Sequence, residues 1–418
     1  MKKIAYLCTM MLLSVNMMAQ IDPFDRNWDT IVFDDFNETN RQFNNTFQEP
    51  LGKWLSFVPS LWPSGVTKGN TSHQIYQWDH CIFDGINGHL LLNSEYIRCT
   101  PILCNEQPYY YDIPPTTYGI NYHCNPDHIY LYYKSGIIES PPSETNLRSD
   151  NLPAPRFLYG FFEIRCQLPV HEGAFPAFWL WDSMNNQYYE EIDIFEVSKY
   201  FTDPDMTTWT HNPNPLGISD NKTFTTGLYY NENGSSIGPT TSQARNYPSV
   251  SLNSNLTNWH TFSCEWMPEH VIWYCDGRVV NEYNNSDSIP HHPLTLKANY
   301  GIDRYALQSY LNSGTPVWTG SDSMIIDYIK VLQLNWDCNA DEVITQQSDL
   351  VNFEYGVKNS IDITSSIESV HIGNTDNVTF RVADSFKVSG PFQVNIGGMF
   401  TVMAQECPDE RNLKNHKY

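Results

Sequence analysis

The stretch EEIDIFE, residues 190–196, sets four carboxylates among isoleucine and phenylalanine. In a β-strand successive side chains point to opposite faces, so Glu191 and Asp193 would share a face and Glu196 would lie on the other. Unbroken alternation would therefore mix charged and apolar side chains on both faces, which fits neither a core nor a solvated surface. A β-bulge inserts one extra residue and reverses the facing pattern beyond it. We predict a bulge at Ile194–Phe195 that brings Glu191, Asp193 and Glu196 onto one face.

Carboxylates arranged in this way have a chemical use, because two carboxyl groups on one surface suffice to cleave a glycosidic bond. With the bulge absorbed, Glu191 and Glu196 lie roughly 13 Å apart between Cα atoms. Two glutamates can lean across that gap to the ~5 Å spacing that retaining catalysis requires. Asp193 would hydrogen-bond to one of them and help hold the two in different protonation states. On these residues alone, a plain acidic strand remains an equal alternative.

The rest of the chain has the pattern of an all-β protein. β-Branched and aromatic runs bounded by Gly, Pro, Asn and Asp recur along its 418 residues, whereas long stretches at helical spacing are hard to find. Residues 260–280 predict a hairpin that turns at Met267–His270 and ends in an Asp-Gly turn. Residues 81–97 predict an Asn-Gly turn at 87–88 and then a strand, and residues 323–334 predict a closing strand. Many antiparallel strands favour a sandwich of two packed sheets.

The formal net charge of −23 limits the partners of this chain. A field of that sign repels nucleic acid and anionic membranes. After the N-terminal leader, no segment is apolar for long enough to cross a bilayer. We therefore expect a monomer with no nucleic-acid partner and no membrane insertion.

Residues 1–19, MKKIAYLCTMMLLSVNMMA, have the character of a signal peptide. Two lysines precede an apolar stretch that ends with Ala19 before Gln20. Cys8 lies too early, inside the apolar stretch, to serve as a lipoprotein anchor. The expected location is therefore secreted or periplasmic, and the expected catalytic domain covers residues 20–336.

A small C-terminal β module of unknown role is expected over residues 337–418. From Val378, short alternating strands carry phenylalanines at near six-residue spacing, at 380, 386, 392 and 400. With Gly-Pro and Gly-Gly punctuation, this pattern indicates a short ladder or solenoid. A spacer or stabilising role and a sugar-binding role both stay open.

Nine cysteines remain after the leader, in a compartment that permits disulfides. Cys99, Cys104 and Cys124 cluster around a loop-like insertion, and Cys264 and Cys275 flank the predicted hairpin turn. Each set could form a bridge, and buried free thiols are the alternative. Because the chain has no CxxC pair, a cysteine-based zinc site is not expected.

EIDIFE resembles the E-x-D-x-x-E motif of glycoside hydrolase family sixteen, the laminarinase and agarase-like clan, in its β-bulge form. The resemblance covers most of residues 25–333, and it implies a jelly-roll, concanavalin A-like β-sandwich that hydrolyses β-linked polysaccharides with retention and endo-action. Six segments resemble family segments in the same order: DTIVFDDFN (29–37), YYKSGIIES (132–140), YGFFEIRCQLP (159–169), AFPAFWLW (174–181), NWHTFSCEWMPEHVIWYCDG (258–277) and MIIDYIKVLQ (324–333).

The resemblance also assigns roles by position in the motif. It makes Glu191 the nucleophile and Glu196 the general acid/base, with Asp193 as the assisting carboxylate between them. Glu190 lies outside the motif and is expected to be structural or solvated. This chemistry requires no cofactor.

Three aromatic residues near the motif are predicted to bind substrate, since the apolar face of a pyranose stacks on a π surface. Trp179 lies in a segment that resembles the family's tryptophan-rich region, and Trp181 shares its face by alternation. Tyr189 stands just ahead of the motif, where relatives often carry tryptophan. A core position is the alternative for each, and it is the expectation for Trp266 and Trp273.

Some family members hold a structural calcium through an aspartate of the closing strand, and the resemblance places Asp327 there, with Asp35 as a contributor. Two departures from the family leave the substrate open: no histidine follows in residues 224–233, and residues 98–128 form a long aromatic insertion. The expected partner is a polysaccharide or oligosaccharide with β-linked glucan or galactan-type chains. The alternatives are a non-catalytic carbohydrate-binding protein on the same sandwich and a transglycosylase that uses the same carboxylates.

Overall fold

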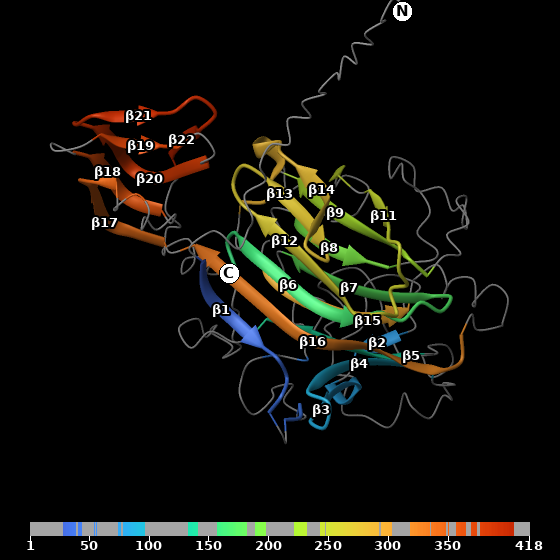
Figure 1. Ribbon diagram of the computed structural model, residues 1–418. Coiled ribbons are helices and arrows are strands. Elements are labelled where there is room, and N and C mark those ends of the chain that lie inside the picture. The colour runs from blue at the N-terminus through green and yellow to red at the C-terminus, as the bar shows by residue number, and fades with distance from the viewer. Residues whose placement is uncertain are drawn as a thin grey trace, which may run out of the picture. The chain divides into compact units, whose positions relative to one another are not determined.

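The structure is a computed structural model dominated by β-strands (Figure 1). The leader, the insertion at 98–128 and its three cysteines lie outside the described residues. The chain forms a larger compact unit, mainly Asp29–Gln333, and a smaller one, mainly Leu334–Cys407. The described residues are 28–38, 41–43, 54, 56, 74–76, 78–96, 133–140, 157–181, 189–197, 221–231, 243–246, 248–291, 294–302, 318–334, 336–347, 350, 357–364, 369–373 and 377–404.

Among its described residues, the larger unit contains sixteen strands and two short 3-10 helices, η3 (Trp78–His80) and η5 (Ser286–Ser288). Within the described residues, no helix has the length and apolar character that a membrane crossing needs. The strands are β1 (Trp28–Asp34), β2 (Gln74–Tyr76), β3 (Cys81–Asp84), β4 (His89–Tyr96), β5 (Tyr133–Glu139), β6 (Gly160–Gln167), β7 (Ala174–Trp181), β8 (Tyr189–Glu196), β9 (Thr223–Asn231), β10 (Gln243–Asn246), β11 (Ser249–Ser251), β12 (His260–Trp266), β13 (Val271–Cys275), β14 (Arg278–Tyr283), β15 (Thr295–Ile302) and β16 (Ser321–Leu334).

These strands form one continuous, mostly antiparallel arrangement that folds into two layers. We call sheet B the run β10-β9-β8-β7-β15-β5, and sheet A the run β4-β16-β6-β12-β13-β14. Strand β5 pairs with β15 on one side and with β4 on the other, so it joins the two sheets. The predicted all-β sandwich is confirmed.

The core lies between the sheets and fixes which face of sheet B points inward. Phe195 of β8 packs on Phe178 of β7 and on Phe262 of β12, with ring centroids 6.4 Å and 4.6 Å apart. All three rings are fully buried. Trp266 and Trp273 of sheet A have no exposed surface, so the prediction that they belong to the core is confirmed. The residues of β7 and β8 that alternate with these phenylalanines must therefore face away from sheet A.

The predicted turns occur where the sequence places them. The amide of Met267 donates to the carbonyl of His270, and the Asp-Gly turn follows with φ of 51° at Asp276 and 72° at Gly277. Positive φ at both central positions is the type I′ geometry that matches the twist of a hairpin. Gly88 also has a positive φ, of 68°, and its amide donates to the carbonyl of Asp84.

Of the two possibilities left open for Cys264 and Cys275, a bridge or buried free thiols, the structure shows buried free thiols. The hairpin register pairs Cys264 with Trp273 and Cys275 with Phe262, so the two cysteines are not opposite each other. Burial raises the pKa of Cys264 well above its usual range and that of Cys275 to about 12, so both thiols are protonated. They behave as small buried hydrophobes.

Asp34 at the end of β1 anchors the N-terminal part of the sandwich. Its two oxygens accept hydrogen bonds from both Arg41 guanidinium nitrogens at 2.8 Å, and from the Trp54 indole at 2.7 Å. The amide of Phe36, which has a φ of 53°, also donates to Asp34. Asp34 and Arg41 are both buried, and the guanidinium carbon lies 4.4 Å from the centroid of the Phe83 ring. A buried pair with so many donors resists removal of either partner.

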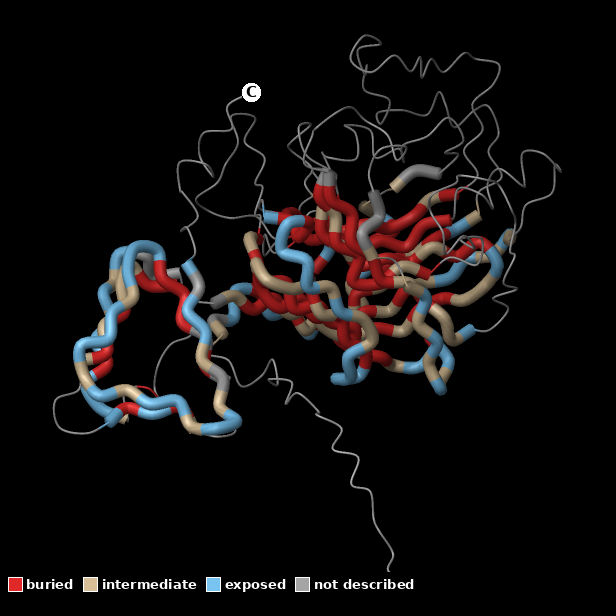
Figure 2. The backbone as a smooth tube through the Cα atoms, turned by 90° about the horizontal axis from the view of Figure 1, so that it is seen from above, coloured by how far each residue is buried: buried red, intermediate tan, exposed pale blue. Residues whose placement is uncertain are grey.

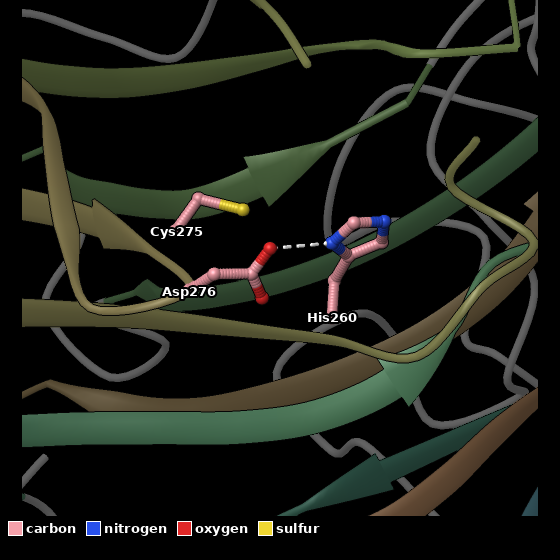
Figure 3. Close-up of side chains that lie close together, drawn as sticks. All are labelled: His260, Cys275 and Asp276. Carbon is pink, nitrogen blue, oxygen red and sulfur yellow. Dashed lines mark hydrogen bonds and ion pairs between the residues drawn. The ribbon is translucent and has the colours of Figure 1, made fainter. Parts of the chain in front are cut away.

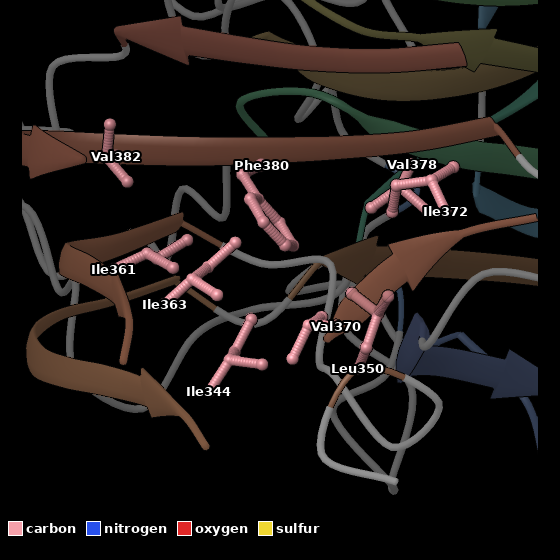
Figure 4. Close-up of a cluster of buried hydrophobic side chains, with 9 residues drawn as sticks. All are labelled: Ile344, Leu350, Ile361, Ile363, Val370, Ile372, Val378, Phe380 and Val382. Carbon is pink, nitrogen blue, oxygen red and sulfur yellow. The ribbon is translucent and has the colours of Figure 1, made fainter. Parts of the chain in front are cut away.

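The smaller unit is a short parallel coil, drawn end-on as a triangular winding in Figure 2. Its main sheet has the order β17-β18-β20-β22, and β19 pairs in parallel with β21. This parallel stacking is the ladder or solenoid that the phenylalanine spacing predicts. Phe380 is fully buried in its core (Figure 4). Phe386, Phe392 and Phe400 pack against that core. The strands are β17 (Trp336–Ile344), β18 (Val357–Ile363), β19 (Val370–Ile372), β20 (Asn377–Val388), β21 (Phe392–Val394) and β22 (Met399–Ala404).

Replacing Arg41 by Ala should lower the free energy of unfolding by about 3–5 kcal/mol, because it leaves the Asp34 carboxylate buried without its cation. Glu38→Gln is the matched control, since Glu38 also contacts Arg41 but its side chain is 41% exposed. We expect the control to change stability by less than about 1 kcal/mol. Urea unfolding followed by tryptophan fluorescence measures both, and equal losses in the two variants would contradict the anchoring role.

Candidate active site

The predicted bulge in β8 is confirmed by the register on both sides of the strand. Towards β9, Asp193 pairs with Gly227 and Glu196 pairs with Thr225, so β8 uses one more residue than its neighbour. Towards β7, Phe195 and Asp193 pair with two consecutive residues, Phe178 and Trp179. The extra residue lies between Asp193 and Glu196, as the alternation of charges in the sequence requires.

The bulge brings Glu191, Asp193 and Glu196 to the face of sheet B that points away from sheet A. We call this the carboxylate face. Asp193 is 1% exposed, whereas Glu191 and Glu196 are each part-exposed. Glu190 points to the other side and is fully buried, with its Oε1 3.6 Å from Nδ1 of His291. Glu190 is thus structural, one of the two roles expected for it.

Asp193 is the most perturbed carboxyl group of this set. Burial raises its pKa well above the usual range, and the negative charges of Glu196 and Glu191 raise it further. Among the described residues, neither Asp193 oxygen meets a hydrogen-bond donor. A protonated Asp193 resolves both problems, because it carries no charge and can itself donate a hydrogen bond to a neighbouring carboxylate.

Trp273 of sheet A holds the backbone at the bulge. Its indole Nε1 donates to the carbonyl oxygen of Asp193 at 2.9 Å, across the core. A bulge interrupts the regular ladder and leaves backbone groups in need of other partners. The fully buried tryptophan supplies one, and it ties the position of Asp193 to sheet A.

The structure places both predicted tryptophans on the carboxylate face. Trp179 pairs directly with Asp193, and Trp181 pairs directly with Glu191. Both side chains are part-exposed, and their ring centroids lie 5.9 Å apart at an interplanar angle of 28°. Tyr189 opens β8 and pairs with Asn231, but its side chain lies outside the described residues.

Glu139, Lys297 and Asn299 also lie on this face and were not among the residues predicted from the sequence. Lys297 pairs with Trp179 on one side and Glu139 on the other, and all three polar residues are buried. Lys297 Nζ lies 3.0 Å from Glu139 Oε1, and the Trp179 indole donates to Asn299 Oδ1 at 2.8 Å. A lysine inside the otherwise uncharged strand TLKANYGI was the signal that could have been noticed.

Asp327 does not fit the predicted calcium. It lies at an irregularity of β16, and its carboxylate contacts Arg165 and stands 3.8 Å from Nε2 of His89. Calcium needs several oxygen ligands, and a basic guanidinium occupies that position here. The other aspartate named for the ion, Asp35, lies near Asp34 and Glu38. There too a cation is already present, because Arg41 bridges Asp34 and Glu38.

His260, Cys275 and Asp276 form the other compact group of possible metal ligands among the described residues (Figure 3). The His260 ring is fully engaged: Nδ1 contacts Asp276 at 2.8 Å and Nε2 donates to the carbonyl of Asn255 at 3.0 Å. Asp276 also accepts the amide of Thr261. The group therefore fastens the Asp-Gly turn to β12 and leaves no ligand atom free on the histidine.

The chemistry available to the carboxylate face is that of two part-exposed glutamates separated by a neutral acid. One can act as a nucleophile and the other as a proton donor, which is the requirement for retaining cleavage of a glycosidic bond. The two adjacent indole rings offer a stacking surface beside them.

Comparison with known families supports this assignment by sequence. Residues 144–309 match the model of Glycosyl hydrolases family 16. The endo-1,3-1,4-beta-glycanase ExsH of Rhizobium meliloti is 26% identical over 182 residues, which are 43% of this chain and 31% of that protein. The kappa-carrageenase of Pseudoalteromonas carrageenovora is 22% identical over 219 residues, covering 48% of this chain and 47% of that enzyme. The chain thus spans less than half of the length of these curated relatives, 31% of one and 47% of the other.

Similar solved structures include the laminarinase catalytic domain of Thermotoga petrophila RKU-1. It is 18% identical, has a TM-score of 0.47, and the match covers 74% of this chain and 98% of that one. A family 16 protein of Bacteroides ovatus, solved with a G4G4G3G product, is 19% identical with a TM-score of 0.45, and the match covers 72% and 99% of the two chains.

The raised pKa of Asp193 gives stability a defined dependence on pH. An aspartate in the unfolded chain loses its proton near pH ~4, whereas the folded protein keeps the proton on Asp193 to a higher pH. Unfolding therefore releases a proton, and the free energy of unfolding falls as pH rises above about 4. The side chain in Asp193→Asn is always neutral, so its free energy of unfolding should not fall in this way. Relative to the wild type, the variant should therefore become more stable between about pH 5 and about pH 8.

Urea unfolding at the two pH values measures the gap between variant and wild type. Asp84→Asn is the control of opposite sign, because hydrogen bonds from Asn87 lower the pKa of the part-exposed Asp84. In the wild type, the stability contributed by ionised Asp84 is lost only at acidic pH, as Asp84 becomes protonated. The gap in free energy of unfolding between Asp84→Asn and wild type should therefore change there and not between pH 5 and pH 8. A gap between Asp193→Asn and wild type that is constant from pH 5 to pH 8 would show that Asp193 is ionised in the folded protein.

Proposed function

The larger unit belongs to glycoside hydrolase family 16, and on this premise we propose that the chain is an endo-acting, retaining glycoside hydrolase of β-linked polysaccharide or glycan chains. The observation that carries the proposal is the bulge of β8, which sets Glu191, Asp193 and Glu196 on one face. A carbohydrate-binding protein without catalysis would have no need for a buried Asp193 of raised pKa between two glutamates.

In the first step, the Glu191 carboxylate attacks the anomeric carbon and forms a covalent glycosyl–enzyme ester. Glu196 gives its proton to the leaving glycosidic oxygen, so the aglycone half departs as an alcohol. Protonated Asp193 donates a hydrogen bond to a neighbouring glutamate, which favours the charged form of that neighbour. The burial that keeps Asp193 neutral thus helps to keep the nucleophile ionised.

In the second step, Glu196, now a carboxylate, takes a proton from water as the water attacks the anomeric carbon. The ester to Glu191 breaks, the sugar leaves with its original configuration, and both glutamates return to their starting protonation states. If a sugar hydroxyl replaces the water, the same residues perform transglycosylation.

The substrate class is supported by the named activities of relatives, which act on 1,3-1,4-β-glycan and on kappa-carrageenan. We propose β-linked glucan or galactan-type chains for this protein. We also propose that the protein is exported, on the strength of its N-terminal 19 residues, and that catalysis needs no cofactor.

Two substrates separate the roles of the glutamates. On a natural polysaccharide, Glu191→Gln and Glu196→Gln should each lower kcat/KM by about 10²- to 10⁴-fold. On an aryl glycoside with a good leaving group, Glu196→Gln should still form the glycosyl–enzyme at a near wild-type rate, because that leaving group needs no proton. Glu191→Gln should show the same large loss of kcat/KM on both substrates.

The matched control is Glu282→Gln, which removes an exposed carboxylate of β14 and should leave both activities unchanged. Polysaccharide cleavage that survives both active-site substitutions would refute the catalytic assignment.

The stereochemistry gives an independent result. NMR of the first products should show a β anomer, which mutarotates later, because two displacements at one carbon restore configuration. A screen of β-1,3-glucan, mixed-linkage glucan and galactans with product sizing should show mid-sized fragments early, as endo-action requires. An initial α anomer would exclude Glu191 as a nucleophile.

A further inference from the structure

One buried ion pair on the carboxylate face has no part in the proposed cleavage. Lys297 has no exposed surface and Glu139 is 6% exposed, and they meet at 3.0 Å. Replacing a buried pair of this kind by apolar residues rarely costs stability, because desolvation offsets the attraction between the charges. Stability alone therefore does not explain the pair, and its position suggests another role.

The ammonium group of Lys297 lies close to both tryptophan rings. Lys297 Nζ lies 5.5 Å from the ring centroid of Trp179 and 5.6 Å from that of Trp181. These distances are within the range of a cation–π contact, which is strongest when the cation is desolvated. The rings cover a lysine with no exposed surface, while they themselves stay part-exposed.

The Trp179 ring makes a hydrogen bond at its edge in addition to the cation–π contact at its face. Its indole nitrogen donates to Asn299 Oδ1, and the Asn299 amide reaches the hydroxyl of Tyr76 at 3.3 Å. With the cation under the face and an acceptor at the edge, rotation of the ring is restricted in both directions. A sugar that stacks on such a ring loses less binding free energy to the ordering of the side chain.

The Lys297–Glu139 pair also lies close to the three carboxylates of β8. Asp193, Trp179, Lys297 and Glu139 are successive cross-strand partners, so they form one row on the same face. Lys297 is two strands from Asp193, or about 10 Å between backbones. A sugar on the tryptophans would therefore lie beside the reacting bond.

The charges on this face define what the tryptophans can accept. On the described, carboxylate-facing side chains of β5, β7, β8, β9 and β15, Lys297 is the one cation, and Glu139 neutralises it. The glutamates of β8 and the net charge of −23 repel anionic groups. A sulfated or uronic sugar would find no free positive partner in this row.

We propose that the Lys297–Glu139 pair holds Trp179 and Trp181 as a preformed platform for an uncharged sugar beside the three carboxylates. Lys297 is a positioning residue in this arrangement and does not touch the reacting atoms. The inference rests on the proposed function and narrows its substrate class to neutral β-glycans at this position.

The test removes both charges together, since Lys297→Met alone would leave Glu139 buried without a partner. The double variant Lys297→Met/Glu139→Leu should raise KM for a neutral β-glucan about tenfold and change kcat by less than about twofold, because the platform binds ground state and transition state alike. The quenching of tryptophan fluorescence by a neutral β-gluco-oligosaccharide should weaken by the same factor. Circular dichroism confirms that the variant is folded.

The chain offers a closely matched control in sheet A. Lys330 Nζ lies 2.6 Å from Glu163 Oε1 and 6.0 Å from the ring centroids of both Phe161 and Tyr328. This pair has the same chemistry but belongs to β16 and β6. Lys330→Met/Glu163→Leu should leave KM and the fluorescence titration unchanged. Equal KM values for the two double variants would overturn the positioning role.

A third variant tests the preference for uncharged sugars. Glu139→Gln keeps an acceptor for Lys297 but frees its positive charge. The ratio of kcat/KM on a carboxymethylated β-glucan to kcat/KM on the neutral polymer should rise about fivefold, whereas Glu163→Gln should leave it unchanged. An unchanged ratio in Glu139→Gln would overturn the charge argument.

A wild-type chain that cleaves no β-glycan would refute the proposed function. The fluorescence titration would then still decide this inference, because binding does not require cleavage. Wild-type cleavage with no difference between the two double variants would refute the inference alone.

Discussion

The arrangement of the carboxylate face depends on the β-bulge at Ile194–Phe195. Without the extra residue, the side chain of Glu196 would point into the core, towards Phe178 and Phe262. A carboxylate would then stand where Phe195 now packs on these two rings. The same insertion therefore satisfies two demands: it keeps an aromatic residue in the core and sends a glutamate to the opposite face. Trp273 ties this geometry to sheet A through the Asp193 carbonyl, so the position of the carboxylates depends on packing across the whole sandwich.

The electrostatics of the site follow from unequal burial of similar groups. Asp193 is enclosed and the glutamates on either side are part-exposed, so the cost of a third negative charge falls on the aspartate. A short side chain makes this possible, because a glutamate at position 193 could reach towards solvent. In the proposed mechanism, the buried Asp193 would thus influence the protonation of the two glutamates that act on the glycosidic bond.

Patterns with a short range in sequence predicted the fold and the three carboxylates. The parity of charges in EEIDIFE required the bulge, and the Asp-Gly turn fixed a hairpin. The register from the Met267–His270 turn also excludes a bridge between Cys264 and Cys275, because it places each of them opposite an aromatic residue. The calcium expectation came from family position alone, and Arg165 could not be placed next to Asp327 without knowing that β6 neighbours β16.

Lys297 and Glu139 escaped for a related reason, since 158 positions separate them in the chain and only the order β7-β15-β5 joins them. The protein contains two lysine–glutamate pairs with nearly the same internal geometry, each with a cation over two aromatic rings. Their chemistry is the same, and their surroundings differ: one lies in a row with Asp193 under part-exposed indoles, and the other joins β6 to β16. The ion pair alone therefore does not define a role for Lys297. Its place in the row of cross-strand partners, next to Trp179 and two strands from Asp193, does.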